Sequence, residues 1–367
     1  MHKQLRNIFL SILLLTVSSV TCLAVSEVVL RYIFPQRLVA HYDGLFMLDD
    51  VLGYKMTPGW SGISSSPEYQ HEIKINSSGF YDTEFPREDD NVTKIVLLGD
   101  SFIFDVGNPY GKRLSEVLEK HLNSMDLIKR ENKEVDVLNM GVDGYDPYRY
   151  LLTWKQIGRN YKPDLVLLGF FVGNDYVEKP KKIVPGRPKS SYHGIKAVLY
   201  SINEFLESRS HLFILLRTSF ESIRIRLGLS DKYLPRILKD PEGAVKSTLP
   251  VMQEICKEFK DGPPLIIFQI PHRAIVDKQF ARKIAKVNGI SFGNLNFNAV
   301  SRAFMMITKP CKSFSCVDLE EAFKGSGGGK LFFPIDGHWN GRGVEVTAKA
   351  LLPEIKKILF AKIAKKT

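Results

Sequence analysis

The sequence predicts an α/β fold in which helices cover a parallel five-stranded sheet. Five short apolar segments, rich in Val, Ile and Leu, have the nearly continuous hydrophobicity of strands buried on both faces. They span residues 94–99, 135–140, 164–171, 264–270 and 314–319. Apolar residues at helical spacing lie between and after them, at residues 110–125, 148–161 and 341–359. Strands that alternate with helices favour a parallel sheet, in which ligands bind beyond the carboxyl ends of the strands.

Two further regions accompany this core. Residues 35–93 are punctuated by Gly and Pro and contain short alternating runs, such as 71–76, that are typical of edge strands or hairpins. Residues 176–260 are too long for a simple crossover and contain two helical patterns, which predicts a helical cap between the third and fourth strands. We therefore divide the chain into a membrane segment at 1–34, a lead-in at 35–93 and an α/β domain at 94–367.

The first residues predict a membrane anchor. Residues 7–26 carry no charge and would form a helix of ~30 Å at ~1.5 Å per residue, which is enough to cross a bilayer. Lys3 and Arg6 precede them and favour a cytoplasmic N-terminus, which puts the rest of the chain in the periplasm. A cleaved signal peptide is the alternative, because residues 22–24 loosely resemble a cleavage site. The apolar character continues further, which favours an uncleaved single-pass anchor, residues 7–34, in the inner (cytoplasmic) membrane.

The formal net charge of +11 does not by itself indicate nucleic-acid binding, because no nucleic-acid-binding motif accompanies it. The basic residues gather in three segments, at 179–189, 217–228 and 356–366. We predict that these segments form solvated faces and attract an anionic membrane or an acidic polysaccharide.

The cysteines predict no metal site. Cys256 has apolar neighbours at helical spacing and is predicted to be a buried thiol. Cys311 and Cys316 are five residues apart, and we predict that they can form a disulfide in an oxidising periplasm. No pair has the spacing of zinc ligands, and we predict neither a metal nor an organic cofactor.

The candidate chemistry begins with the sequence "GDS" at residues 99–101, where the first predicted strand ends. On its own, Ser101 fits either a nucleophile or a turn and helix-cap residue. A nucleophilic serine needs a base, and one loop before the last helix carries Asp336 and His338. A histidine can take the serine proton, and a neighbouring carboxylate can fix its tautomer. We therefore predict Ser101 as nucleophile, His338 as base and Asp336 as the partner of that base.

Two other residues that follow predicted strands suit an oxyanion hole. Gly144, after the second strand, lets a backbone N–H approach a substrate oxygen, and Asn174, after the third, can donate from its amide. The neighbouring acids Asp100 and Asp175 are predicted to hold loops by hydrogen bonds. His272 has no partner pattern and is predicted to be structural.

These motifs resemble the SGNH (GDSL-type) hydrolase family over residues 94 to about 359. The four positions that give the family its name are matched, in order, by Ser101, Gly144, Asn174 and His338. The two-residue step from Asp336 to His338 is shorter than the family's usual Asp-x-x-His and resembles SGNH-like domains of membrane-anchored alginate acetylation proteins. The resemblance implies a three-layer α/β/α, flavodoxin-like fold, with an oxyanion hole made by the Ser101 N–H, Gly144 and Asn174.

The resemblance also implies an activity. It predicts a serine-dependent hydrolase of carboxylic esters, with short acyl groups such as acetyl, at the cell envelope. Two alternatives stay open: an O-acyltransferase that modifies an envelope polysaccharide, and a catalytically silent glycan-binding scaffold. The α/β-hydrolase and P-loop classes are not predicted, because the sequence lacks a G-x-S-x-G elbow and a complete P-loop motif.

Overall fold

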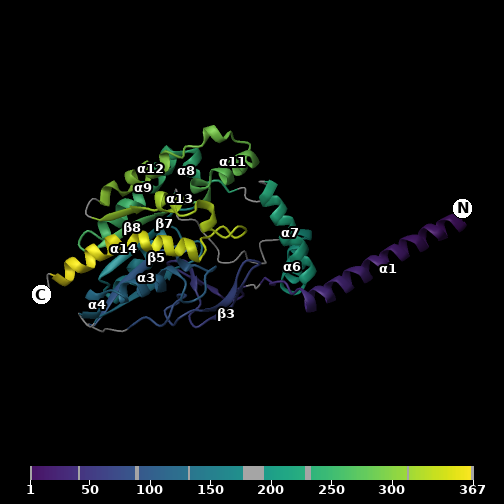
Figure 1. Cartoon of the computed structure of the whole chain (residues 1–367), viewed down its shortest axis with the longest axis horizontal. Coiled ribbons are helices and arrows are strands. Elements are labelled where there is room, and N and C mark those ends of the chain that lie inside the picture. Colours follow the sequence, from purple (N-terminus) through teal and green to yellow (C-terminus); the bar gives the residue numbers. More distant parts are fainter. Residues whose placement is uncertain are drawn as a thin grey trace.

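The computed structural model describes residues 2–39, 42–86, 91–130, 133–176, 194–227, 233–311 and 314–364. A five-stranded sheet lies at its centre, with all neighbouring strands parallel and in the order β6-β5-β7-β8-β9 (Figure 1). Its strands are β5 Val92–Gly99, β6 Glu134–Gly141, β7 Leu165–Phe171, β8 Leu265–Ile270 and β9 Ser315–Asp318. The predicted fold class is therefore confirmed, and each of the five apolar segments forms a strand.

The sheet is covered on both faces, which explains why its strands are apolar throughout. Along β5, Val96 and Leu98 belong to one buried cluster, whereas Ile95 and Leu97 belong to the other. Helices α5 Pro147–Gln156, α9 Pro241–Glu258 and α12 Ala299–Thr308 supply side chains to the first cluster. Helices α3 Leu114–Asn123, α13 Glu320–Gly325 and α14 Gly341–Ala364 supply them to the second. The result is the predicted three-layer α/β/α arrangement.

The strand order places two predicted site segments side by side. Numbered along the chain, the strands run 2-1-3-4-5, so the direction of the connections reverses between β5 and β7. Such a reversal leaves a crevice at the carboxyl ends of the two central strands, where doubly wound folds bind their ligands. Ser101 follows β5 and Asn174 follows β7, so both lie at this crevice.

The lead-in forms two antiparallel hairpins that pack onto the first cluster through Leu45, Met56 and Ile73. One pairs β1 Phe46–Asp49 with β2 Gly53–Met56, and the other pairs β3 Ser61–Ser65 with β4 Gln70–Lys74. The alternating run predicted at 71–76 is largely β4.

The N-terminal helix α1 His2–Ile33 projects from the rest of the molecule (Figure 1). Among the described residues it is the one helix that is long and apolar enough to cross a membrane, over Gln4–Ile33, and its large apolar side chains are exposed. A signal sequence passes the same test of length and composition.

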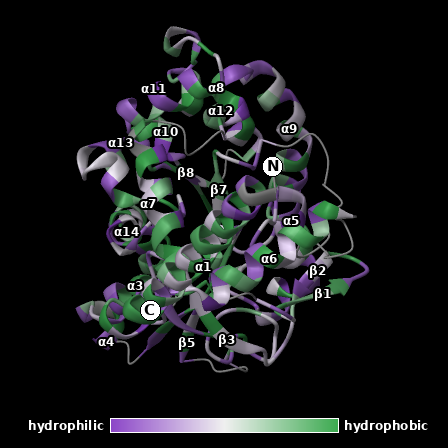
Figure 2. Ribbon diagram, turned by 90° about the vertical axis from the view of Figure 1, so that its right-hand side faces the viewer, coloured by the Kyte–Doolittle hydropathy of each residue, from purple (hydrophilic) through white to green (hydrophobic). Residues whose placement is uncertain are grey.

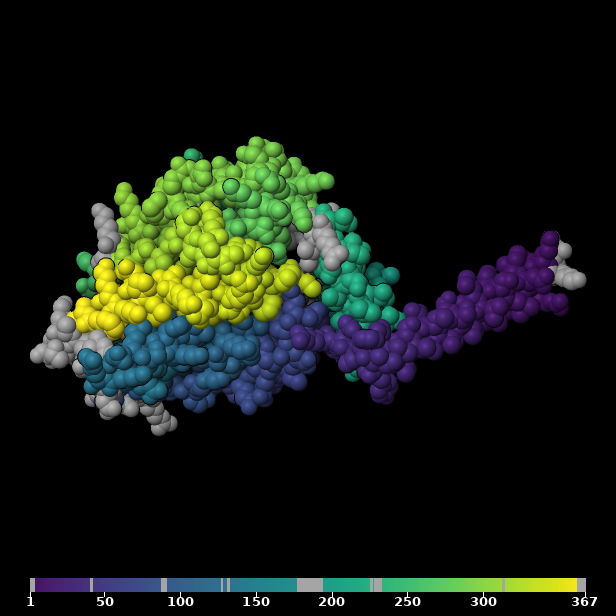
Figure 3. Space-filling view, in the orientation of Figure 1, coloured from purple at the N-terminus to yellow at the C-terminus, as the bar shows by residue number. Residues whose placement is uncertain are grey.

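The segment 176–260 contains two different parts, although its residues 177–193 and 228–232 lie outside the described residues. Helices α6 Ile195–Arg209 and α7 His211–Leu227 lie between the end of α1 and the rest of the molecule (Figure 3). Helices α8 Arg236–Lys239 and α9 instead belong to the layer over the sheet. The basic stretch 179–189 is also outside the described residues. The remaining α-helices are α2 Ser101–Phe104, α4 Asp126–Arg130, α10 Arg273–Val276 and α11 Lys278–Val287.

The prediction for the cysteines is wrong. Cys256 on α9 forms a disulfide with Cys311, whereas Cys316 on β9 is free and exposed. Helices α9 and α12 pack side by side, and the 3-10 turn Lys309–Cys311 that ends α12 brings the two Cα atoms to 4.9 Å. Helix packing, rather than spacing along the chain, therefore selects the pair.

Removing this disulfide is expected to destabilise the protein. The disulfide closes a loop of 55 residues and so reduces the conformational entropy of the unfolded chain. This effect stabilises the folded protein by about 4 kcal/mol at most. The double variant Cys256→Ala with Cys311→Ala is expected to lose 2 to about 4 kcal/mol of unfolding free energy in urea, followed by circular dichroism. Cys316→Ala is the matched control and is expected to change the unfolding free energy by less than about 1 kcal/mol. If the double variant and the wild type unfolded at the same urea concentration, the assignment of the Cys256–Cys311 disulfide would be contradicted.

Candidate active site

The structure brings Ser101, His338 and Asp336 into one chain of hydrogen bonds. Ser101 Oγ lies 2.7 Å from His338 Nε2, and His338 Nδ1 lies 2.7 Å from Asp336 Oδ1. Ser101 is the first residue of α2, directly after β5, and the other two residues stand on the loop before α14. Because an ionised carboxylate only accepts, a neutral His338 carries its proton on Nδ1 and turns the lone pair of Nε2 toward the serine. This arrangement allows the serine proton to pass to His338.

Gly337 explains how a two-residue step from acid to base is sufficient. Its φ is +89°, in the region that favours glycine. The turn lets Asp336 Oδ1 accept from the backbone N–H of His338 at 3.1 Å as well as from its ring at 2.7 Å. The shortened spacing therefore does not separate Asp336 from His338.

The charges around His338 favour its protonated form. Burial alone would lower its pKa, but the hydrogen bond and charge of Asp336, with the charges of Asp143 and Asp100, raise the pKa to about 9. Burial raises the pKa of Asp336, but its bonds to His338 and Tyr69 and the charge of His338 lower it overall. The side chain of His338 is 25 % exposed, so a substrate can reach it. The neutral form of His338 therefore becomes more populated as the pH rises toward 9.

The lead-in holds Asp336 in place. Tyr69 Oη donates to Asp336 Oδ2 at 2.9 Å, and the Glu68 carboxylate accepts from the backbone N–H groups of Ile335 and Asp336 at 3.0 and 2.8 Å. Both residues stand on the β3–β4 loop, 267 positions or more before the loop that they hold. We did not predict this contact, because nothing in the sequence around residues 66–69 distinguishes it from an ordinary hairpin.

Removing the Tyr69 hydroxyl is expected to slow catalysis without unfolding the protein. A hydrogen bond to a charged group contributes about 1.5–3 kcal/mol, so Tyr69→Phe is expected to lower kcat by roughly 10- to 100-fold and leave KM nearly unchanged. Tyr42→Phe removes another lead-in hydroxyl, bonded to Ser64 Oγ at 2.8 Å, and serves as the control with kcat near wild type. Equal losses in both variants would mean that the effect comes from the lead-in in general.

Asn174 and Ser101 present donors for an oxyanion. Asn174 Nδ2 donates one hydrogen to Asp100 Oδ2 at 3.0 Å, which leaves its second amide hydrogen for a substrate oxygen. The N–H of Ser101 lies in the first turn of α2, where helical N–H groups have no partner within the helix. The two residues come from neighbouring strand ends, and their role as oxyanion donors stays a prediction.

Gly144 lies in a turn that requires a positive φ. It lies in the turn that Tyr145 N closes by donating to Val142 O at 3.2 Å, with a φ of +74°. A Cβ at this position would lie 2.8 Å from the hydroxyl of Tyr54. Burial raises the pKa of the neighbouring Asp143, and the Gly144 N–H opposes that rise, so a carboxylate lies near this predicted donor.

The two acids beside these motifs hold loops, as predicted. Asp100 Oδ1 accepts from Phe102 N at 2.9 Å and so caps α2, while its Oδ2 orients Asn174. Asp175 accepts from Tyr150 Oη at 2.9 Å and from Phe171 N at 2.7 Å. Burial raises the pKa of Asp100 to about 6 and raises that of Asp175 well above its ordinary value.

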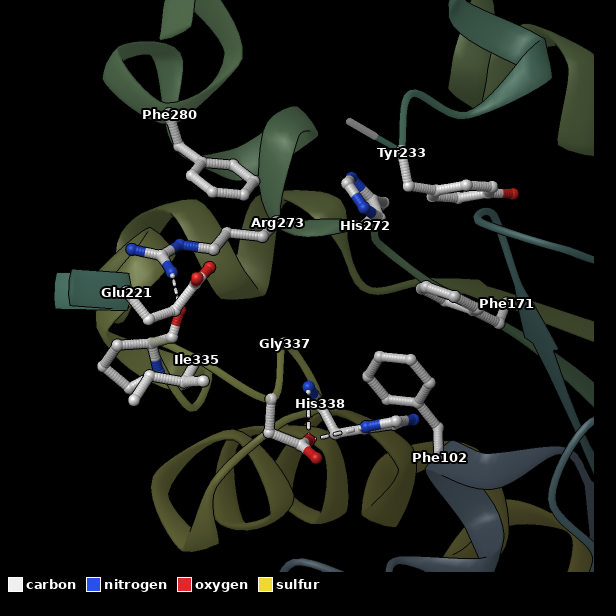
Figure 4. A pocket seen from close by; sticks show the side chains of 12 residues that line it. Phe102, Phe171, Glu221, Tyr233, His272, Arg273, Phe280, Ile335, Gly337 and His338 are labelled. Atoms are coloured by element: carbon white, nitrogen blue, oxygen red, sulfur yellow. Dashed lines mark hydrogen bonds and ion pairs between the residues drawn. The ribbon is translucent and has the colours of Figure 1, made fainter. Parts of the chain in front are cut away.

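A cavity of about 330 Å³ adjoins His338 (Figure 4). Aromatic rings form part of its wall, and polar groups are added by Arg273, His272 and, from α7, Glu221. The rings are Phe102, Phe171, Tyr233 and Phe280. The ring of His272 caps α10 by accepting from Ala274 N at 3.2 Å, which fits its predicted structural role, but it also lines the cavity. Burial and the charge of Arg273 lower the pKa of His272 to about 4, so it is neutral at pH 7.

This wall was not predicted from the sequence, because its members come from separate elements and share no motif. Across the residues that the structure describes, no group of three or more His, Cys, Asp or Glu side chains is arranged to hold a metal ion.

The sequence matches no family model and no curated protein sequence. Among solved structures, TesA aligns over 72 % of this chain and 99 % of its own, at 14 % identity and a TM-score of 0.37. A lipase/acylhydrolase from Enterococcus faecalis aligns over 72 % and 96 %, at 16 % identity and a TM-score of 0.40. A catalytic mutant of an acetylxylan esterase from Geobacillus stearothermophilus aligns over 72 % and 94 %, at 14 % identity and a TM-score of 0.40.

The matched structures include lipases and acetylxylan esterases. One of them, from Parabacteroides merdae, is described as a GDSL-like lipase.

Proposed function

We propose that this chain is a serine-dependent hydrolase of carboxylic esters with short acyl groups. The observation that carries the proposal is the hydrogen-bond chain from Asp336 through His338 to Ser101, with 2.7 Å at each step. Nucleophile, base and orienting carboxylate in this order are the parts that serine acyl chemistry needs.

In the first half-reaction, Ser101 Oγ attacks the ester carbonyl carbon while its proton passes to His338 Nε2. The carbonyl electrons move to the oxygen, which the Ser101 N–H, the Asn174 amide and the Gly144 N–H stabilise. When the intermediate collapses, the carbon–alkoxide bond breaks, and the leaving alcohol takes the proton from His338. The acyl group is then bonded to Ser101.

In the second half-reaction, His338 takes a proton from water and the resulting hydroxide attacks the acyl carbon. The bond to Ser101 Oγ breaks, the serine regains its proton from His338, and the carboxylic acid leaves. Asp336 stays ionised throughout and stabilises the imidazolium in both halves.

We also propose that the α/β domain lies on the outer side of the cytoplasmic membrane, anchored by α1. Lys3 and Arg6 at the start of the chain favour a cytoplasmic N-terminus. The disulfide between Cys256 and Cys311 supports this location, because disulfides persist in oxidising compartments such as the periplasm.

A second candidate is transfer of the acyl group to an envelope polysaccharide. The observation that favours it is the cavity beside His338, whose aromatic walls and polar groups suit a sugar ring. In this variant of the reaction, a sugar hydroxyl replaces water in the second half-reaction, and His338 takes its proton.

The test is covalent labelling of the full-length protein in detergent. A fluorophosphonate is expected to modify Ser101, identified by mass spectrometry, and p-nitrophenyl acetate is expected to release p-nitrophenol. Acetate released into water indicates hydrolysis, whereas acetyl groups that appear on an added polysaccharide indicate transfer. Folded protein that neither labels nor turns over would overturn the proposal and leave the glycan-binding scaffold.

A further inference from the structure

Helices α6 and α7 each expose a stripe of large apolar side chains. On α6 the stripe consists of Ile195, Val198, Leu199, Ile202 and Phe205, which are 49–75 % exposed. On α7 it consists of Leu216, Phe220, Ile223 and Leu227, which are 53–65 % exposed. The spacings of three, four and seven residues put each set on one face of its helix. A helix of a water-soluble domain normally buries such a face.

An ion pair joins the two helices, between Glu207 on α6 and Arg217 on α7. The side chain of Glu207 on α6 is buried, and it accepts hydrogen bonds from Asn203 on its own helix and from Arg217 on α7. The backbone carbonyl of Glu207 also accepts from Val39 N at 3.0 Å. A buried carboxylate between the two helices, together with large apolar side chains that are exposed, is the arrangement expected where the surroundings are lipid rather than water.

The junction of the two helices is tied to the end of α1. The Glu27 carboxylate accepts from Ser210 Oγ at 2.8 Å and from the N–H groups of His211 and Leu212 at 3.0 and 2.9 Å, and so caps α7. Arg31 donates to the backbone carbonyl of Arg209 at 2.9 Å. Glu27 is the first charged residue after the uncharged stretch 7–26. A helix that crosses a bilayer with this stretch would place the junction at the membrane surface.

The two helices run across the end of α1 rather than along it (Figure 1). The end of α1 packs against α7, which packs against α6, and hydrophobic residues are spread along α1 and α6 (Figure 2). With 15 and 17 residues, α6 and α7 are each shorter than the ~20 residues that a transmembrane helix needs. Such helices lie in the membrane surface rather than across it.

We infer that α6 and α7 form a hairpin that rests on the lipid bilayer beside α1, with both apolar stripes among the lipid headgroups and upper acyl chains. This placement of the domain rests on the proposed anchoring by α1 and does not depend on the ester chemistry. It has one consequence for the site: α7 supplies Glu221 to the cavity beside His338, so that cavity lies next to the membrane. Substrates would then reach it along the bilayer surface.

The test measures lipid exposure by spin labelling. The full chain, with Cys22→Ser and Cys316→Ser to leave only the disulfide cysteines, carries one new cysteine, Leu199→Cys or Leu216→Cys, and is reconstituted into vesicles of phosphatidylcholine and phosphatidylglycerol. Lys129→Cys, exposed on α4 at the opposite end of the molecule, is the control. Electron paramagnetic resonance then reports collisions with oxygen, which enriches in lipid, and with a water-soluble nickel chelate.

Labels at 199 and 216 are expected to collide with the nickel chelate several-fold less than the label at 129, and with oxygen several-fold more. Collision rates at 199 and 216 that equal those at 129 would overturn the inference. Low collision rates with both reagents that rise when the protein is diluted in lipid would also overturn the inference. A second copy of the chain, rather than lipid, would then cover the apolar stripes. Circular dichroism of each variant verifies that the helices remain folded.

Discussion

Ser101→Ala is expected to lower kcat for p-nitrophenyl acetate by about 10⁴-fold or more, as removal of a serine nucleophile does in other enzymes of this type. Without Oγ no acyl bond can form, and His338 has only water to activate. The fold is expected to remain intact, because Asp100, which caps α2, is untouched and alanine suits the first turn of a helix. Fluorophosphonate labelling is expected to disappear with the activity.

The control for this variant is Ser78→Ala. Ser78 is a lead-in serine whose Oγ is bonded to Tyr161 Oη at 2.9 Å, and its substitution is expected to leave kcat near wild type. If Ser101→Ala kept the wild-type kcat, the hydrogen bond between Ser101 and His338 would have no part in catalysis. The scaffold reading of the chain would then be preferred.

Much of the fold and the core of the site follow from local patterns. The runs of Val, Ile and Leu that form β5 and β7 are apolar because both faces of the sheet are covered, and the residue after each strand falls at the crevice. Ser101 and Asn174 could therefore be placed near one another before any contact was known. His338 could be placed through its position on the loop before the last helix.

The remaining features depend on contacts between distant segments. Tyr69 lies 267 residues before Asp336, and Glu68 lies 268 residues before it. Both residue types are common in hairpin loops, so the sequence does not indicate these contacts. Cys256 pairs with Cys311 because α9 and α12 are packed together, which spacing along the chain does not reveal. The helical pattern of α6 and α7 was visible, but an apolar stripe alone does not say whether it meets a core or a membrane.

Asp336→Asn is expected to lower kcat by roughly 10³- to 10⁴-fold and to change the pH dependence as well. The wild-type base must be neutral, and its pKa is about 9, so kcat/KM is expected to rise with pH and level off above about pH 9. The pKa of His338 is raised mainly by the hydrogen bond and the charge of Asp336. Without that charge, the rise is expected to move to lower pH, toward the ordinary histidine value of 6.5 or below it, because burial lowers the pKa.

The loss of rate and the shift in pH have separate causes, and a matched variant distinguishes them. Asp143→Asn removes a second charge that raises the pKa of His338, but no hydrogen bond joins Asp143 to the ring. It is expected to shift the profile in the same direction by a smaller amount, with a much smaller loss of kcat. The measurement is kcat/KM for p-nitrophenyl acetate from about pH 5 to about pH 10, corrected for spontaneous hydrolysis. An identical pH midpoint in the wild type and in Asp336→Asn would mean that the carboxylate does not act on His338, and the base would then work without an orienting acid.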